Sequence, residues 1–269
     1  MKRKLVLLTL TLLLALVVTG CGGTSNDSQE GQKITVGVTG GPHERIAEKV
    51  KELALEEGIE IEVVVFNDFI QPNLQLADGA LDINSFQHEP FLNKFMADRN
   101  LKLSVIGQTI NFPMGIFSDK VENVADLKPG SKIGLPNDPT NRARGLILLE
   151  TAGLIKLKEG VGVEATLQDI ADNPNNYELI ELEAPMLLRT LPDLGLAAIN
   201  TNFVIDAGLD PLEESIFLEP KDNPWVNVIV VREGEEDNPL YQRFVEIYHS
   251  DAVKEFITET FKGHVIAAW

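Results

Sequence analysis

The stretch ITVGVTGGPHERIAEKVKELALEEGIEIEVVVF, residues 34–66, decides the fold class of this 269-residue chain. Apolar residues alternate with small or polar ones over residues 34–38, which predicts a strand, and they then recur at helical spacing from Ile46 to Ala54. Glycines separate these patterns, and residues 59–66 predict a second strand. A short helix at 72–77 and a strand at 81–83 continue the alternation. Strands that alternate with helices predict an α/β fold with a mainly parallel sheet covered by helices.

The second half of the chain repeats this plan. Strands are expected at residues 132–135, 177–182 and 196–199, and helices at 141–152 and 185–191. We therefore expect two α/β lobes of similar design. The β-prone segments 111–117 and 226–231 are expected to cross between the lobes as a two-stranded hinge, and helices at 240–248 and 253–261 to pack back on lobe one. Lobe one would then comprise residues 33–112 plus 231–269, and lobe two residues 113–230.

The N-terminus is typical of an exported, lipid-anchored protein. Three basic residues at positions 2–4 precede an apolar run of residues 5–18, which is too short to span a bilayer but has the length of a signal-peptide core. Val18-Thr19-Gly20-Cys21 then resembles the bacterial lipobox, in which the cysteine is lipidated and becomes the new N-terminus. An ordinary secretory signal or an uncleaved anchor is the alternative. We expect a signal peptide at 1–20, lipidation of Cys21 and a flexible tether at 21–32.

The charge balance excludes several functions. The chain has 23 Lys and Arg against 41 Asp and Glu, and removal of residues 1–20 lowers its formal charge from −18 to −21. Such a body lacks the basic stripe of a nucleic-acid-binding protein, and only the lipid would hold it to a membrane. Cys21 is the only cysteine, which excludes an intrachain disulfide framework and a cysteine-rich zinc site.

Two facing lobes would place their strand-end loops in one cleft, where α/β sheets bind ligands. Residues 136–144, PNDPTNRAR, lie in such a loop. With Asn141 or Thr140 as the N-cap, Arg142 and Arg144 would fall in the first helical turn, where backbone amides and a guanidinium together favour an anion such as a ligand carboxylate. Either arginine could instead be a solvated surface residue.

Aromatic and amide side chains lie near other expected strand ends. Aromatic rings there could hold an apolar or thioether side chain, or could simply belong to the core. Amides could bind a zwitterion or cap turns. The aromatic candidates are Phe66, Phe69, Phe86 and Phe91, with His88, and the amide candidates are Asn202 and Asn227.

The sequence gives little support to catalysis or metal binding. It contains no G-x-S-x-G elbow, no P-loop, no G-x-G-x-x-G after a strand and no H-E-x-x-H. His88 and Glu89 are neighbours, which rarely converge on one ion, and the other histidines lack ligand spacing. We expect no enzyme activity, no cofactor and no bound metal.

The chain from about residue 33 to 269 resembles the NlpA-type methionine-binding lipoproteins, the substrate-binding components of methionine ABC importers. Motifs that carry the resemblance are LDINSFQH (81–88), LPNDPTN (135–141) with Arg144, ELEAP (181–185), NTN (200–202) and WVN (225–227). The resemblance implies a bilobed, type II-like periplasmic-binding-protein fold. It also implies that Arg144 grips the ligand carboxylate, that Asn141, Asn202 and Asn227 make polar contacts, and that Phe66, Phe69, Phe86 and His88 line the side-chain pocket.

The resemblance further implies a lipid-anchored receptor outside the cytoplasm, expected to be monomeric, that delivers methionine, expected as the L isomer, to a permease and its ATPase. Phe66, Phe69 and Phe91 stand where many relatives carry tyrosine, which leaves other ligands open: another apolar amino acid, D-methionine or a methionine-containing dipeptide. A metal-ion receptor that uses His43 and His88, or a surface adhesin, are further alternatives.

Overall fold

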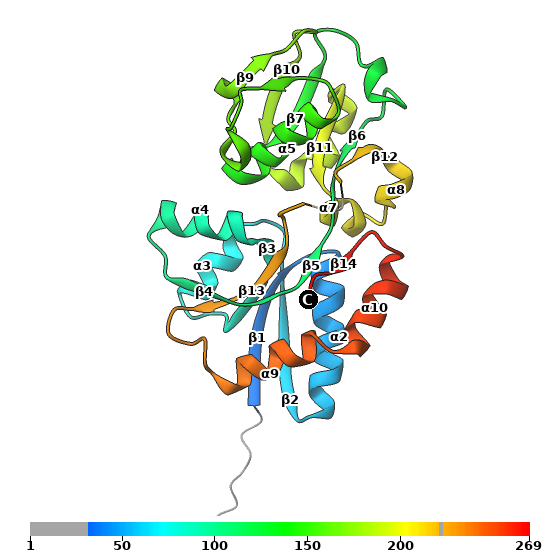
Figure 1. Cartoon of the computed structure of the whole chain (residues 1–269). Coiled ribbons are helices and arrows are strands. Elements are labelled where there is room, and N and C mark those ends of the chain that lie inside the picture. The colour runs from blue at the N-terminus through cyan, green and yellow to red at the C-terminus, as the bar shows by residue number, and fades with distance from the viewer. Residues whose placement is uncertain (1–31, 221–222) are drawn as a thin grey trace, which may run out of the picture. The chain divides into compact units, whose positions relative to one another are not determined.

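The computed structural model describes residues 32–220 and 223–269, which include a compact unit from Gln32 to Trp269 (Figure 1). The expected signal peptide, Cys21 and the tether up to residue 31 lie outside the described residues. Within the described part, no helix is both long enough and apolar enough to cross a membrane.

The first sheet combines strands from the two ends of this unit. Its five strands lie side by side in the order β2 (Ile59–Phe66), β1 (Gln32–Thr39), β3 (Ile83–His88), β13 (Asn227–Arg232) and β4 (Leu103–Gln108). Neighbouring pairs among β2, β1 and β3 are parallel, whereas β13 is antiparallel to both β3 and β4. The sheet therefore has one reversed strand, which comes from the C-terminal part of the chain.

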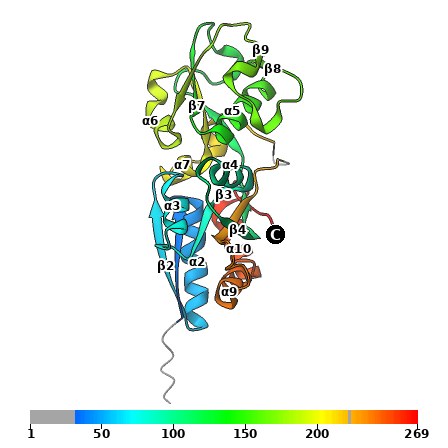
Figure 2. The ribbon, with the colours of Figure 1, turned by 90° about the vertical axis from the view of Figure 1, so that its left-hand side faces the viewer.

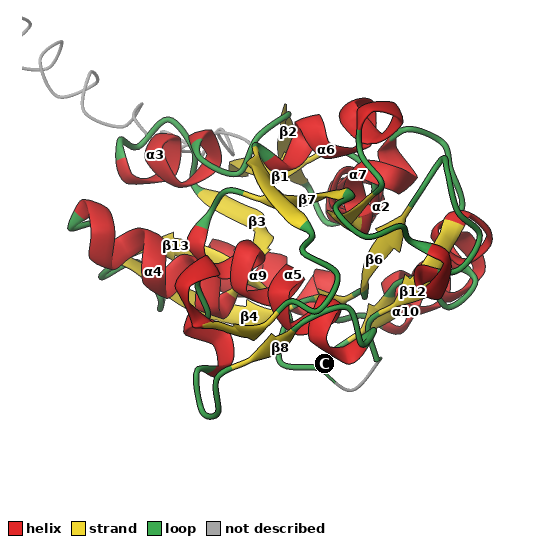
Figure 3. Cartoon of the chain, turned by 90° about the horizontal axis from the view of Figure 1, so that it is seen from above, coloured by secondary structure: helices red, strands yellow, loops and turns green. Residues whose placement is uncertain are grey.

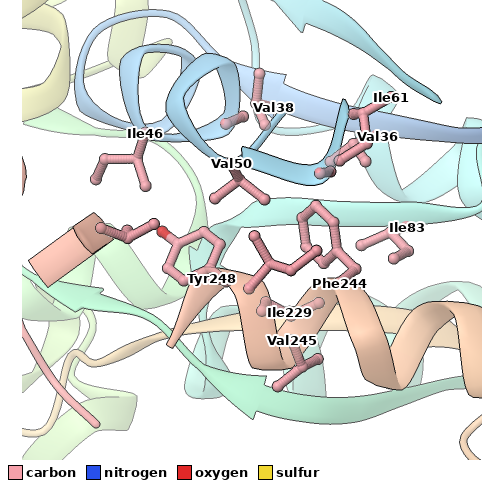
Figure 4. Close-up of a cluster of buried hydrophobic side chains, with 14 of the residues drawn as sticks. Val36, Val38, Ile46, Val50, Ile61, Ile83, Ile229, Phe244, Val245 and Tyr248 are labelled. Atoms are coloured by element: carbon pink, nitrogen blue, oxygen red, sulfur yellow. The ribbon is translucent and has the colours of Figure 1, made fainter. Parts of the chain in front are cut away.

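Helices cover both faces of the first sheet. One face packs against α2 (Pro42–Glu56), α9 (Pro239–Tyr248) and α10 (Asp251–Phe261) in a core that includes Phe244 and Tyr248 (Figure 4). Val228 and Val230 of β13 point to the other face, toward α3 (Gln71–Ala77) and α4 (Glu89–Arg99). The expected helices of residues 46–54, 240–248 and 253–261 therefore exist, and they bury the apolar stripe that predicted them.

The second sheet has the same plan. Its strands lie in the order β10 (Glu178–Leu182), β7 (Lys132–Pro136), β11 (Leu196–Asn200), β6 (Met114–Phe117) and β12 (Ser215–Leu218). The first three are parallel, and β6 is antiparallel to both of its neighbours. Helix α5 (Pro139–Thr151) covers one face, and α6 (Leu187–Thr190) and α7 (Thr201–Asp206) contribute to the core on the other.

Short elements complete the chain. Strand β5 (Ile110–Asn111) pairs with β14 (Ile266–Ala267), and β8 (Lys156–Leu157) pairs with β9 (Ile170–Asp172). A one-turn helix, α8 (Pro211–Glu214), precedes β12. Five 3₁₀ turns lie among the described residues: η1 (Val124–Asp126), η2 (Gly162–Glu164), η3 (Leu167–Asp169), η4 (Ala184–Met186) and η5 (Leu191–Asp193).

The two sheets form two lobes, one above the other in Figures 1 and 2, with helices beside the strands when seen from above in Figure 3. In each lobe the reversed strand is the first one that the chain enters after it crosses from the other lobe. Strand β6 follows the first crossing, and β13 follows the second. This common topology confirms the predicted bilobed fold of two related α/β halves.

The lobe boundaries differ from the expected ones by one strand. Segments 111–117 and 226–231 were expected as crossing strands, but β6 lies within the second sheet and β13 within the first. The described parts of the crossings are the segments just before them, at residues 112–113, 219–220 and 223–226. Apolar alternation marks a residue as β-structure but carries no information about which sheet it joins, so sequence pattern alone misses this assignment.

Candidate functional site

A small cavity lies where the two lobes meet. Its volume is about 20 Å³, close to the space of one water molecule. Lobe one contributes the end of β3 and the start of α4, and lobe two contributes the first turns of α5 and the start of α7. The lining residues are Phe69, Phe86, Gln87, His88, Phe91, Phe112, Asn141, Arg144, Asn200, Asn202 and Asn227. Of the residues that the family resemblance implies for the ligand pocket, all but Phe66 line this cavity.

Phe66 lies in the core of lobe one instead. It ends β2 and packs with Leu76 and Leu81 beneath α3. Its position at a strand end suggested the cleft, but its side chain faces the interior of the lobe. The structure therefore does not bring Phe66 together with the other expected residues.

Aromatic rings form one wall of the cavity. Phe69, Phe86 and Phe91 of lobe one lie 6.0–6.2 Å apart between ring centroids. Behind this wall, Phe203 of lobe two lies 5.1 Å from Phe69 between ring centroids, so an aromatic contact joins the two lobes next to the cavity. Phe203 was not among the expected residues, although it follows the NTN motif directly.

Helix α5 begins differently from the prediction. Asp138 is its N-cap and accepts a hydrogen bond from the backbone amide of Asn141 at 2.9 Å. Arg144 therefore lies in the second turn, and a carboxylate of the protein already occupies the helix N-terminus. Arg142 pairs with Glu181 at 2.7 Å, away from the cavity lining, as a surface arginine would.

Arg144 is 2% exposed, and its guanidinium is held by the protein on one edge. Its Nε donates to the Glu219 carboxylate at 3.1 Å and its NH2 at 2.5 Å. NH2 also donates to the Phe112 carbonyl at 2.9 Å. Trp225 lies 5.3 Å from the guanidinium carbon, which is cation–π distance. Glu219 was missed by sequence reasoning, although it directly follows the apolar strand 215–218.

His88 links the lobes as a neutral imidazole. Its Nδ1 accepts from the backbone amide of Phe91 at 3.1 Å, which caps α4, so the proton resides on Nε2. Nε2 then donates to Asn141 Oδ1, 3.3 Å away in lobe two. Burial, together with the nearby charge of Arg144, lowers the pKa of His88 to about 3. His88 therefore positions α4 and Asn141 rather than acting as a cation.

The cavity amides fall into two groups. Asn141 and Asn227 are engaged within the protein: Asn141 Oδ1 accepts from Asn200 Nδ2 at 2.8 Å, and Asn227 Nδ2 donates to the Ile110 carbonyl at 3.1 Å. Asn200 Oδ1 and Asn202 Nδ2 are buried and have no hydrogen-bond partner among the residues described. A free acceptor and a free donor beside a buried arginine suit a ligand with one ammonium and one carboxylate.

A larger cavity of about 440 Å³ adjoins the first one and shares Phe69 and Phe91 with it. It lies between α3 and α4 of lobe one and residues 137–140 and 183–185 of lobe two. The ELEAP motif thus contributes to its rim. No group of three His, Cys, Asp or Glu side chains arranged for a metal ion is present in the described part of the chain.

Comparisons with known proteins agree with this architecture. The NlpA lipoprotein family model matches residues 34–269. The chain belongs to the NlpA lipoprotein family. Among the relatives of this NlpA-family chain, the D-methionine-binding lipoprotein MetQ of Salmonella typhimurium is 42% identical over 258 residues, which cover 95% of this chain and 94% of the relative. MetQ of Escherichia coli is 41% identical over 258 residues, which cover 95% of this chain and 94% of that relative.

A solved structure gives the same result for the fold of the family. A nutrient binding protein from Burkholderia cenocepacia, bound to methionine, superposes with a TM-score of 0.85 at 42% identity and covers 88% of this chain and 100% of that one. The resemblance inferred from the LDINSFQH, LPNDPTN and NTN motifs is therefore confirmed.

Proposed function

We propose that this NlpA-family protein binds methionine between its lobes and delivers it to an ABC importer, without enzyme activity of its own. The observation that carries the proposal is the combination in one inter-lobe cavity of buried Arg144, the unpartnered amide atoms of Asn200 and Asn202, and an aromatic wall. Relatives at about 40% identity that are named for D-methionine, and a structural neighbour bound to methionine, support the choice of ligand.

The chemistry of each group fits one part of the ligand. Arg144 and the Asn202 Nδ2 donor suit the carboxylate, and the Asn200 Oδ1 acceptor suits the ammonium. The rings of Phe69, Phe86 and Phe91 suit a thioether, because sulfur–aromatic contacts contribute about 0.3–1.5 kcal/mol. These roles distribute the ligand over both lobes.

Ligand entry requires the lobes to move. A cavity of about 20 Å³ is too small for an amino acid, so the site must widen before methionine enters and then close around it. Ligand contacts to both lobes would stabilise the closed form. Residues 112–113, 219–220 and 223–226 are the described segments about which this motion would occur.

The proposal extends to the cellular setting. Lipidation of Cys21 would hold the protein at the outer face of the cell membrane, with residues 21–32 as a tether. It would act there as a monomer and dock on a membrane permease coupled to an ATPase. The lipoprotein names of the relatives support this setting.

The test is calorimetry on residues 22–269, unfolded and refolded to remove carried-over ligand, with L-methionine and D-methionine in separate titrations. We expect saturable one-to-one binding that leucine and zinc do not reproduce, and the isomer that binds more tightly is the preferred ligand. Arg144→Ala should remove binding, and Arg142→Ala, on the same helix, should retain it. Absence of heat from refolded, monodisperse protein with both isomers would refute the methionine assignment.

A further inference from the structure

Glu219 neutralises the arginine of the site from inside the protein. Glu219 directly follows β12 and is 8% exposed. Both oxygens are engaged: Oε1 accepts from Arg144 Nε at 3.2 Å, and Oε2 accepts from NH2 at 2.5 Å and from the backbone amide of Met114 at 3.0 Å. The carboxylate is therefore fixed by a backbone donor as well as by the guanidinium.

This pairing leaves one corner of Arg144 for a ligand. Nε and NH2 are engaged by Glu219 and by the Phe112 carbonyl, whereas NH1 has no hydrogen-bond partner among the described residues. A ligand carboxylate would therefore meet the NH1 corner. It would not meet the Nε–NH2 edge on which arginine often forms two parallel hydrogen bonds.

The pairing also fixes the net charge of the site. Apart from Arg144, the residues that line the small cavity carry amide or aromatic side chains, or the imidazole of His88, whose buried ring stays neutral at physiological pH. The charge of Arg144 is balanced by Glu219 before any ligand arrives. Beside a buried ion pair, a ligand without net charge leaves every charge paired, whereas a charged ligand leaves one buried ion uncompensated. The uncharged ligand should therefore bind more tightly.

We infer that Glu219 is a positioning and charge-balancing residue that makes this site select ligands of zero net charge. The inference rests on the proposed function and adds a specificity determinant to it. Glu219 orients the NH1 corner of Arg144 toward the cavity. Its negative charge attracts the ligand ammonium and opposes a ligand that carries only a carboxylate.

The experiment compares L-methionine with its 2-hydroxy analogue, in which a hydroxyl replaces the ammonium at nearly the same size and the net charge becomes −1. Both affinities are measured by calorimetry for the wild type, Glu219→Gln and Glu219→Asp. Glu214→Gln is the matched control, because it removes one negative charge from the exposed helix α8 a few residues away.

We expect the preference of the wild type for methionine over the hydroxy analogue to fall at least tenfold in Glu219→Gln. Glu219→Asp keeps the charge and should keep the preference, even where both affinities decrease. Glu214→Gln should match the wild type. If Glu219 had only a structural role, Glu219→Gln would lower the affinities for methionine and for the hydroxy analogue by the same factor. An unchanged preference in Glu219→Gln would therefore overturn the inference.

A measurement on the wild type covers the case in which Glu219→Gln does not fold. The hydroxy analogue and methioninamide, which carries a net charge of +1, should each bind at least tenfold more weakly than methionine. If either charged analogue bound as tightly as methionine, selection by net charge would be contradicted. If the wild type binds methionine but shows no charge discrimination, only this inference fails. If it binds no methionine, the proposed function itself fails.

Discussion

Gly41 offers a direct test of lobe closure. It precedes α2 in lobe one with φ +84° and ψ −128°, a conformation that glycine alone adopts readily. A Cβ added there would lie 2.6 Å from the backbone carbonyl oxygen of Asn202 in lobe two. That distance is about 0.8 Å short of the ordinary contact limit of 3.4 Å. Since the obstacle is backbone, only a separation of the lobes relieves it.

Gly58 provides the matched control for Gly41→Ala. It also has a positive φ, +79°, but no atom lies within 4 Å of an added Cβ. Alanine at Gly58 incurs the strain of a positive φ, about 1–2 kcal/mol, which lowers Tm by about 2–4 °C per kcal/mol in a body of this size. Gly41 combines its positive φ with ψ −128°, outside the left-handed helical region, so alanine there costs more backbone strain and lowers Tm further. The obstruction between the lobes is added in Gly41→Ala alone.

Gly41→Ala should therefore weaken methionine binding at least tenfold, equivalent to about 1.4 kcal/mol, while Gly58→Ala binds like the wild type. Small-angle scattering in saturating methionine should give a larger radius of gyration for Gly41→Ala than for the control. If Gly41→Ala binds as tightly as the wild type, or if Gly58→Ala loses as much affinity, the closed arrangement does not govern binding.

Three further perturbations separate the stabilising residues of the site from those left for the ligand. Arg144→Ala should lower the free energy of unfolding by about 3–5 kcal/mol in urea titrations, because it leaves Glu219 as an unpaired buried charge. The double variant Arg144→Ala/Glu219→Gln should recover part of that free energy without recovering methionine binding. The pKa of His88 is lowered from 6.5 to about 3, so below pH 6.5 the unfolded chain binds a proton that the folded chain excludes. The contribution of His88 to the free energy of unfolding should therefore fall by about 1.4 kcal/mol per pH unit between pH 6.5 and pH 3. His88→Gln should reduce the slope of this free energy against pH, and equal slopes in the variant and the wild type would argue against a neutral His88. Asn202→Ala removes an amide whose Nδ2 has no partner in the described structure, so methionine affinity should fall at least tenfold with Tm within about 2 °C of the wild type, whereas a large loss of Tm would assign Asn202 to the core.

Sequence periodicity predicted the elements that expose one face to solvent. Helices α2, α9 and α10 each bury an apolar stripe, and that stripe is visible as spacing in the sequence. The central strand β3 was predicted only over residues 81–83, yet it runs from Ile83 to His88 and is buried throughout. Its polar residues resemble a loop because their burial depends on partners elsewhere.

Those partners lie outside any local window. Asn84 and Gln87 of β3 form a closed amide network with Asn73 of α3, with distances of 2.6–3.0 Å. Glu219 likewise meets Arg144 across 75 residues of sequence. A pattern rule scores each of these residues as polar and therefore exposed. Only the fold shows that each has a buried partner, which is why Glu219 could not be predicted as the counterion of Arg144.

The distribution of satisfied and unsatisfied groups gives the lobes different tasks. Under the proposed function, lobe two would hold the groups that recognise the amino-acid backbone, because Arg144, Asn200 and Asn202 all lie on α5 or at the junction of β11 and α7. Lobe one supplies most of the rings that suit the side chain. A ligand bound to lobe two alone would leave its thioether in water, and closure would bury it against Phe69 and Phe86. The hydrophobic contribution of the side chain is therefore gained only on closure, so ligands with the same backbone but shorter side chains should bind to lobe two and close the protein less completely.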